Sequence, residues 1–102
     1  MRSDLPYRIE YSPVAEENLR LQTARQQHTV LDAVDEQLTH QPTVETRHRK
    51  PMRPNPVAPW ELRVGDLRVY YVEEEPEAVV LILAVGWKER NRVHIGGEVI
   101  DL

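Results

Sequence analysis

The 102-residue sequence contains no cysteine and no long apolar run. Without cysteine there are no disulfide bonds and no thiolate metal sites, which fits a reducing compartment. A membrane-crossing helix needs roughly 18 to 20 apolar residues, and no segment approaches that length. The segment Met1–Tyr11 has neither the apolar stretch nor the small-residue cleavage site of a secretory signal. We therefore expect a cytoplasmic protein with no membrane partner, stabilised by packing alone.

Cofactor motifs are missing as well. The sequence has no phosphate-binding glycine-rich loop, no HExxH motif and no EF-hand loop, and Gly96-Gly97 is long enough only for a turn. The four histidines are scattered, and His48 stands between Arg47 and Arg49, whose positive charge disfavours a bound cation. We expect no cofactor and no metal site.

The chain also lacks an excess of positive charge, since its formal net charge is -4. That value argues against a protein that coats nucleic acid over its whole surface. The charges are nevertheless segregated, with acids in the expected helices and in Glu73–Glu77, and bases in Arg47–Arg53 and Lys88–Arg92. This pattern indicates a basic face on an acidic body, and the alternative is two solvated loops.

The length fits one domain, residues 1–102, with 40% apolar residues to build one core. Tyr7–Tyr11 alternates and predicts a strand, and Ser12-Pro13 is a typical helix start. Pro42 ends the helical region. Within it the apolar stripe changes phase near Thr23, which favours two packed helices over one long helix.

Strands dominate the second half of the chain. Residues 43–59 carry four prolines among several bases and predict an extended basic loop. Trp60–Val64 and Leu67–Val72 alternate around a Gly-Asp turn and predict a β-hairpin. Ala78–Val85 is continuously apolar, as in a central strand with both faces buried, and Gly86 is predicted to end it. Residues 87–92 read as a polar connection, and residues 93–100 as a short last element or a tail.

The predicted fold class is α+β: an N-terminal strand, two packed helices and a three-stranded antiparallel meander that shares one sheet with the first strand. The two periodicities also predict which apolar residues face the core. The expected core residues are Ile9, Ala15, Leu19, Leu31, Val34, Leu38, Leu62, Val64, Val69, Tyr71, Val80, Ile82 and Ala84.

Charged residues of the hairpin are the first candidates for a site. Alternation places Leu62 and Val64 on the core face, so Glu61 and Arg63 share the opposite, open face, and Arg68 joins them from the second strand. Such a cluster beside a basic loop suits a phosphodiester. The alternative is that Glu61 only pairs with Arg68 across the hairpin.

Two stretches resemble toxins of the RelE/ParE superfamily of type II toxin-antitoxin modules. Trp60–Tyr71 is similar to their hairpin, in which an aromatic residue, a base, a Gly-containing turn and a second Arg recur. Leu83–His94 resembles the segment that leaves the last core strand through a basic cluster toward an aromatic residue. With the strand-helix-helix start, the resemblance covers nearly the whole chain.

The resemblance implies a ribosome-dependent endoribonuclease that cleaves messenger RNA and is silenced by a cognate antitoxin. The reaction, attack of a ribose 2'-hydroxyl on the adjacent phosphate, needs a base, an acid and cations. The implied catalytic set is Glu61, Arg63, Arg68, Lys88 and His94, and the implied RNA-binding set is Arg47, Arg49, Lys50, Arg53, Arg90 and Arg92.

Some assignments stay open in the sequence. Glu61 stands where RelE itself has a lysine, and a carboxylate beside a histidine is closer to the acid-base arrangement of the YoeB-like branch. His94 lies between Val93 and Ile95 and has either a catalytic or a structural role. The functional alternatives are a ParE-like inhibitor that binds DNA gyrase without hydrolysis, and a degenerate toxin kept as a binding module.

Overall fold

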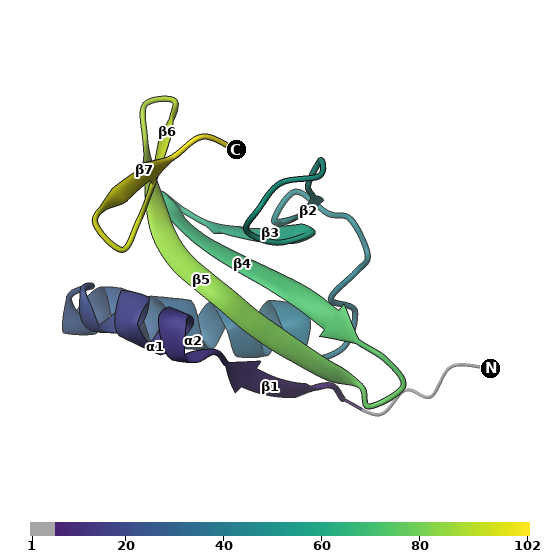
Figure 1. The fold of residues 1–102 in the computed structure, drawn as a ribbon. Coiled ribbons are helices and arrows are strands. Elements are labelled where there is room, and N and C mark those ends of the chain that lie inside the picture. The colour runs from purple at the N-terminus through teal and green to yellow at the C-terminus, as the bar shows by residue number, and fades with distance from the viewer. Residues whose placement is uncertain (1–5) are drawn as a thin grey trace.

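Two helices and seven strands make up the computed structural model, which describes residues 6–102. Residues 1–5, which the single-domain prediction includes, lie outside the described residues. Both helices cover one face of the sheet, and the connection between the second and third strands lies on the other side (Figure 1). The elements in chain order are β1 (Arg8–Tyr11), α1 (Pro13–Arg20), α2 (Ala24–Leu38), β2 (Arg49–Pro51), β3 (Trp60–Val64), β4 (Leu67–Glu74), β5 (Val79–Glu89), β6 (Arg92–Ile95) and β7 (Glu98–Ile100).

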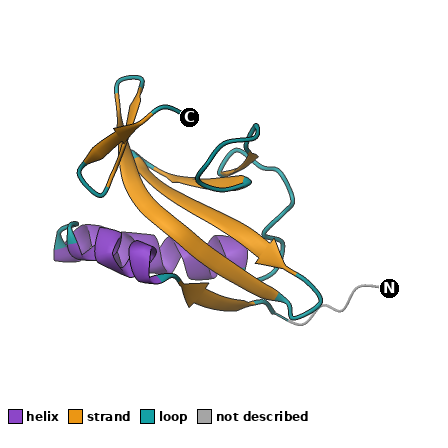
Figure 2. Cartoon of the chain, viewed as in Figure 1, coloured by secondary structure: helices purple, strands orange, loops and turns teal. Residues whose placement is uncertain are grey.

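The strands form one sheet in the order β2-β3-β4-β5-β6-β7, and β1 pairs with β5 in parallel. All other pairs are antiparallel. The helices and strands are separate segments of the chain, as Figure 2 shows by colour. The predicted α+β class, with two helices and a mostly antiparallel sheet, is confirmed.

Side-chain caps explain why the helical region divides in two. The Ser12 hydroxyl accepts a hydrogen bond from the Ala15 backbone N–H at 3.0 Å, and Pro13 opens α1. Thr23 caps α2 in the same way, with Gln26 completing a capping box. The phase change near Thr23 is therefore the start of a second helix.

The sheet is larger than predicted. Pro51 lies in β2 inside the expected loop, which is possible because β2 is an edge strand and a proline there needs no donor on its outer side. The prediction that Gly86 ends the central strand is wrong, since β5 continues to Glu89 and pairs with β6. A Cβ on Gly86 would lie 2.0 Å from the His94 carbonyl oxygen, so a glycine is required where β6 approaches β5.

The main core lies between the helices and the sheet. Val30, Val34 and Leu38 of α2 are fully buried against strand residues that include Ile82, which confirms Ile82 as a core residue. Ile9, Leu19 and Val64 pack at its edge and are partly buried. The placement of Leu31 in the core is wrong: this side chain is 39% exposed, because the buried stripe of α2 follows Val30, Val34 and Leu38.

A second apolar cluster covers the other face of the sheet. It consists of Ala58, Tyr70, Ala84 and Val93, with partly buried residues from the β2–β3 loop and β6 packed around it. Ala84 is thus buried, but in this cluster and not in the main core. The face predicted to be open is therefore largely covered.

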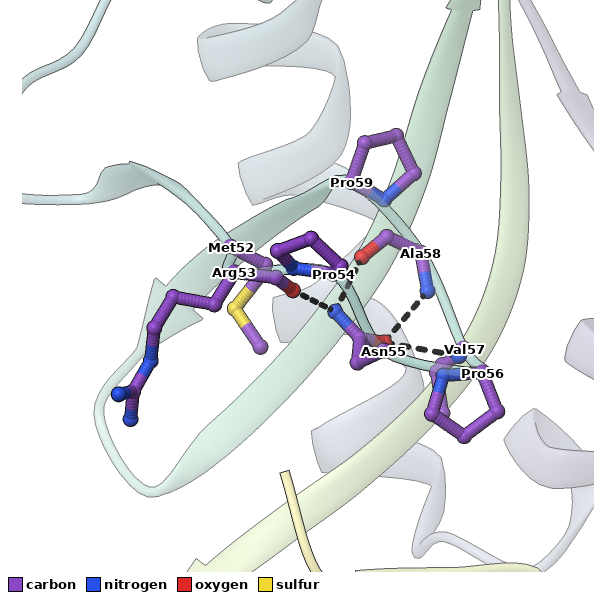
Figure 3. A pocket seen from close by; sticks show the side chains of 8 residues that line it. All are labelled: Met52, Arg53, Pro54, Asn55, Pro56, Val57, Ala58 and Pro59. Atoms are coloured by element: carbon purple, nitrogen blue, oxygen red, sulfur yellow. Dashed lines mark hydrogen bonds between the residues drawn. The ribbon is translucent and has the colours of Figure 1, made fainter.

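Asn55 organises the loop that supplies this cover. Its Nδ2 donates to the carbonyl oxygens of Arg53 and Ala58, and its Oδ1 accepts from the backbone N–H groups of Val57 and Ala58 (Figure 3). These bonds fold residues 52–59 into a compact turn beside a hollow of about 410 Å³. Ala58 is thereby held against Tyr70 in the second cluster, and the Arg53 side chain extends away from the Asn55 amide (Figure 3).

Candidate functional site

A polar cavity of about 690 Å³ lies on the sheet face away from the helices. The loop that follows β2 forms one wall and contributes Arg53. Glu61 and Arg63 of β3 and Lys88 of β5 line the cavity from the sheet, and residues 100–102 line it from the chain segment that follows β6. The cavity thus brings together three cations, Arg53, Arg63 and Lys88, and two carboxylates, Glu61 and Asp101, from four separate segments.

Strand register explains this convergence. Glu61 lies directly opposite Tyr70, and Arg63 directly opposite Arg68, so these four side chains share one face of the hairpin. On β5, Gly86 is the partner of Arg68, and Lys88, two residues on, pairs with Val93 of the second cluster. Lys88 therefore points to the same face.

Glu61 is the buried centre of the charged cluster. The expectation that Glu61 lies on an open face is wrong, since the residue is only 6% exposed. Its Oε1 accepts from Arg63 Nε at 2.8 Å, its Oε2 accepts from Tyr70 Oη at 2.9 Å, and Arg68 Nε is 4.0 Å from Oε2. A buried carboxylate is tolerated only with such partners, so these contacts also stabilise the fold.

The two arginines of the hairpin differ in their surroundings. Arg63 has a half-exposed side chain at the cavity and bonds Glu61 through Nε. The Arg68 side chain is 11% exposed, and its Nη1 donates to the carbonyl oxygens of Gly65 and Leu67 in the turn. Like charges directly opposite each other on a sheet are unfavourable, and the Glu61 carboxylate between them offsets that repulsion. Arg63 is the better placed of the two to meet a ligand.

Tyr70 was not among the predicted site residues. It is fully buried, and burial, followed by the negative charge of Glu61, raises the pKa of Tyr70 well above its ordinary value. The phenol therefore stays protonated and donates to Glu61. One signal pointed to it: Ala78–Val85 is apolar on both faces, so something had to cover the second face, where Tyr70 lies.

His94 does not join the cavity. Its register partner is Trp87, the neighbour of Lys88, and both side chains are on the opposite face of the sheet from Lys88 and Arg63. The His94 and Trp87 rings stack with centroids 5.0 Å apart and planes 4° apart. Glu89 lies 3.8 Å from His94 Nε2. The expectation that His94 stands beside Glu61 is corrected by this alternation.

The predicted RNA-binding bases are also divided. Arg49 is set apart from the other bases: it is buried on the helix side of β2, where its Nε donates to the Val44 carbonyl oxygen and its Nη1 to that of Gln37. Lys50, one position on, points to the Glu61 side and lies 3.7 Å from Glu45. The bases that remain exposed are Arg47, Arg53, Arg90 and Arg92.

Arg90 and Arg92 flank the β5–β6 turn, at a smaller hollow of about 430 Å³ that His94 also lines. Of these exposed bases only Arg53 lines the polar cavity. Among residues 6–102, no group of three or more His, Asp or Glu is arranged to hold a metal ion. In the same part of the chain, neither helix is long and apolar enough to cross a membrane.

The chain has an α+β fold that is also seen in a toxin-antitoxin complex of known structure. A chain in the crystal structure of the toxin-antitoxin complex RelBE2 from Mycobacterium tuberculosis is similar to this chain, with a TM-score of 0.73 and 23% sequence identity. The similarity covers 86% of this chain and 98% of that chain. No family model and no curated protein matches the sequence. At this identity, the likeness establishes the fold.

Proposed function

We propose that the chain is the toxin of a type II toxin-antitoxin module and that it cleaves messenger RNA on the ribosome. The observation that carries the proposal is the cavity in which Arg53, Arg63 and Lys88 converge from three separate segments on one sheet face. The three cations outnumber the two carboxylates of the lining, Glu61 and Asp101, and suit the negative charge of a phosphodiester. The RelE-like fold supports the proposal, because the similar chain belongs to a toxin-antitoxin complex.

The proposed reaction forms a bond between the ribose 2'-oxygen and phosphorus and breaks the bond between phosphorus and the 5'-oxygen of the next nucleotide. The 2'-hydroxyl loses a proton and the departing oxygen gains one. Arg63 and Lys88 stabilise the charge that builds on the phosphoryl oxygens. Arg68 reinforces their field from behind Glu61, and the exposed Arg47, Arg90 and Arg92 attract the RNA backbone.

An antitoxin partner follows from the same proposal. A toxin has to be held silent by a large and reversible contact, so a neighbouring small protein should bind tightly to this chain. We expect poor expression of the chain alone and good expression of the pair. Growth of the host without harm during expression of the chain alone contradicts this expectation.

A second candidate function, inhibition of DNA gyrase by binding without hydrolysis, is favoured by one observation. His94 lies on the other face of the sheet, so the cavity lacks the carboxylate-histidine pair expected from the sequence. A surface that only binds does not need such a pair.

One assay separates the two functions. The chain is added to a translation reaction, and ribosome-bound message is analysed by primer extension. Ribosome-dependent cuts that disappear with Arg63→Ala support the nuclease. Intact message together with inhibited gyrase supercoiling rejects the nuclease in favour of the second candidate.

A further inference from the structure

We infer that Tyr70 and Glu61 form a buried positioning pair, in which Tyr70 fixes the Glu61 carboxylate as a counter-ion and Glu61 directs the Arg63 guanidinium into the cavity. Glu61 is accordingly a positioning residue and not the general base. The inference rests on the proposed function, in which Arg63 binds the RNA phosphate.

Tyr70 is more deeply buried than Glu61 and Arg63, the charged residues that it positions. It is fully buried in the second cluster with Ala58, Ala84 and Val93, and it lies directly opposite Glu61 in the β3–β4 ladder. Packing on all sides leaves an aromatic ring few rotamers. The hydroxyl group therefore presents a fixed donor to Glu61 Oε2 at 2.9 Å.

The second oxygen of Glu61 holds Arg63. The contact uses Nε at 2.8 Å, so the guanidinium is anchored at its inner edge. Within residues 6–102, this is the one side-chain hydrogen bond that Arg63 makes, and the side chain lines the cavity with almost half of its surface exposed. The terminal nitrogens are left to donate a bidentate pair of hydrogen bonds to a phosphate. Arg68, by contrast, donates hydrogen bonds from Nη1 to the backbone carbonyl oxygens of Gly65 and Leu67.

These contacts argue against proton abstraction by Glu61. A general base must bring a lone pair within hydrogen-bond distance of the hydroxyl it deprotonates. Glu61 lines the cavity, but the residue is only 6% exposed and both of its carboxylate oxygens already accept a hydrogen bond, one from Arg63 and one from Tyr70. A ribose hydroxyl would have to compete with Arg63 or with Tyr70 for an oxygen of Glu61.

The test uses the isotope-labelled full chain and two buried tyrosines. Nuclear magnetic resonance follows the Arg63 Nε–H signal and its exchange with water while inorganic phosphate is titrated. Tyr70→Phe should accelerate that exchange and weaken phosphate binding by about 3- to 10-fold, the effect of losing one ordinary hydrogen bond. Tyr71→Phe is the matched control, because it removes an equally buried hydroxyl that donates to the Pro42 carbonyl oxygen and does not contact Glu61.

Equal Arg63 exchange and phosphate affinity in Tyr70→Phe and Tyr71→Phe overturn the inference. If Tyr70→Phe does not fold, Glu61→Gln takes its place: it keeps an acceptor for Arg63 but removes the charge. An unchanged Arg63 signal in that variant also overturns the inference.

The cleavage assay adds a separate result. If Glu61 is a positioning residue, Glu61→Gln should lower the cleavage rate but leave the shape of its pH profile the same as in the wild type. If Glu61→Gln instead loses most of its activity, and the remaining activity no longer falls at acidic pH, then Glu61 is the general base and the inference is refuted. A wild type that cuts no RNA but shows the predicted Tyr70 effect on phosphate binding rejects the proposed function and supports the pair.

Discussion

Replacing Arg63 with alanine and replacing Arg68 with alanine should have very different effects on stability. Arg68 is buried to nearly nine-tenths of its side chain, and Nη1 bonds two carbonyl oxygens at 2.7 and 2.9 Å. Hydrogen bonds from a charged group contribute about 1.5 to 3 kcal/mol. Because both bonds share one nitrogen, we expect Arg68→Ala to lower the free energy of unfolding by about 2 to 4 kcal/mol. That corresponds to a fall in Tm of about 10 to 20 °C for a domain of this size.

Arg63→Ala removes a half-exposed side chain with one ion pair. Glu61 keeps its bond from Tyr70 and the nearby charge of Arg68, so the expected loss of stability is about 1 kcal/mol. Loss of a cation that stabilises the transition state costs about 2.7 to 4 kcal/mol, or roughly 100- to 1000-fold in rate. Arg63→Ala should therefore fold almost like the wild type and lose its toxicity.

The assay combines growth arrest after induced expression with thermal melting of each purified variant. Arg8→Ala is the matched control, because Arg8 Nε bonds Glu10 Oε2 at 3.0 Å with the same two-residue spacing, but on an exposed part of β1. The control should remain toxic and lose at most about 1 kcal/mol. A toxic Arg63→Ala variant refutes the role of this cation. Equal melting temperatures for Arg63→Ala and Arg68→Ala refute the claim that Arg68 contributes more to stability than Arg63.

Three further predictions concern the fold around the site. Gly86→Ala should lower the free energy of unfolding by about 3 kcal/mol and expose the β6 amides to hydrogen exchange, because its Cβ meets a backbone oxygen. Gly97→Ala is the control: an added Cβ meets no atom there, and the φ of +85° alone should cost only about 1 to 2 kcal/mol. If urea denaturation gives equal losses of stability for the two variants, the close approach at Gly86 is contradicted. Arg49→Met should cost about 2 to 4 kcal/mol in the same assay while toxicity per folded molecule is unchanged, and a stable but non-toxic variant would assign Arg49 to RNA. Burial raises the pKa of Tyr11 to about 12, and Tyr70 shifts in the same direction, so the folded state keeps protons that the unfolded state releases above about pH 10. The contribution of these tyrosines to stability should be constant below that pH and fall from about pH 10 to 12. Tyrosines that titrate at their ordinary pKa before the protein unfolds contradict this assignment.

Local chemistry made the helices and the hairpin predictable. Ser12-Pro13 and Thr23 carry cap signals that depend on a few neighbouring residues, and both caps are present in the structure. The alternation of Trp60–Val64 and Leu67–Val72 likewise depends on neighbours within one hairpin. The β2 strand was missed because its partner strand, β3, lies about ten residues later in the chain, and its proline argued against any strand.

The continuation of β5 through Gly86 was missed for a related reason. A glycine at the end of an apolar run is as compatible with a turn as with close approach of another strand. Only the position of the His94 carbonyl oxygen distinguishes the two. Information of that kind depends on where β6 runs and is absent from the local sequence.

The candidate site was half predictable, and the boundary has a physical cause. Alternation correctly places Glu61, Arg63 and Arg68 on one face of the hairpin, but it does not say what covers that face. The cover comes from the Asn55 turn, which directly precedes the hairpin, and from β6, which follows β5, and neither segment shares the alternating pattern of the hairpin. One set of alternating charges is therefore sorted by depth into a buried carboxylate, a nearly buried Arg68 and an accessible Arg63.

Depth, more than residue type, decides what each of these charges is able to do. A buried carboxylate with a phenol and a guanidinium on its two oxygens orients a cation, whereas the same carboxylate in water would be free to accept a proton. The apolar run of β5 already required a cover on both faces, and that requirement applies to every side chain that shares a face with Ala84. A polar residue on this covered face has to find a partner in the protein, and Glu61 on β3 finds Tyr70 on β4 and Arg63 on its own strand.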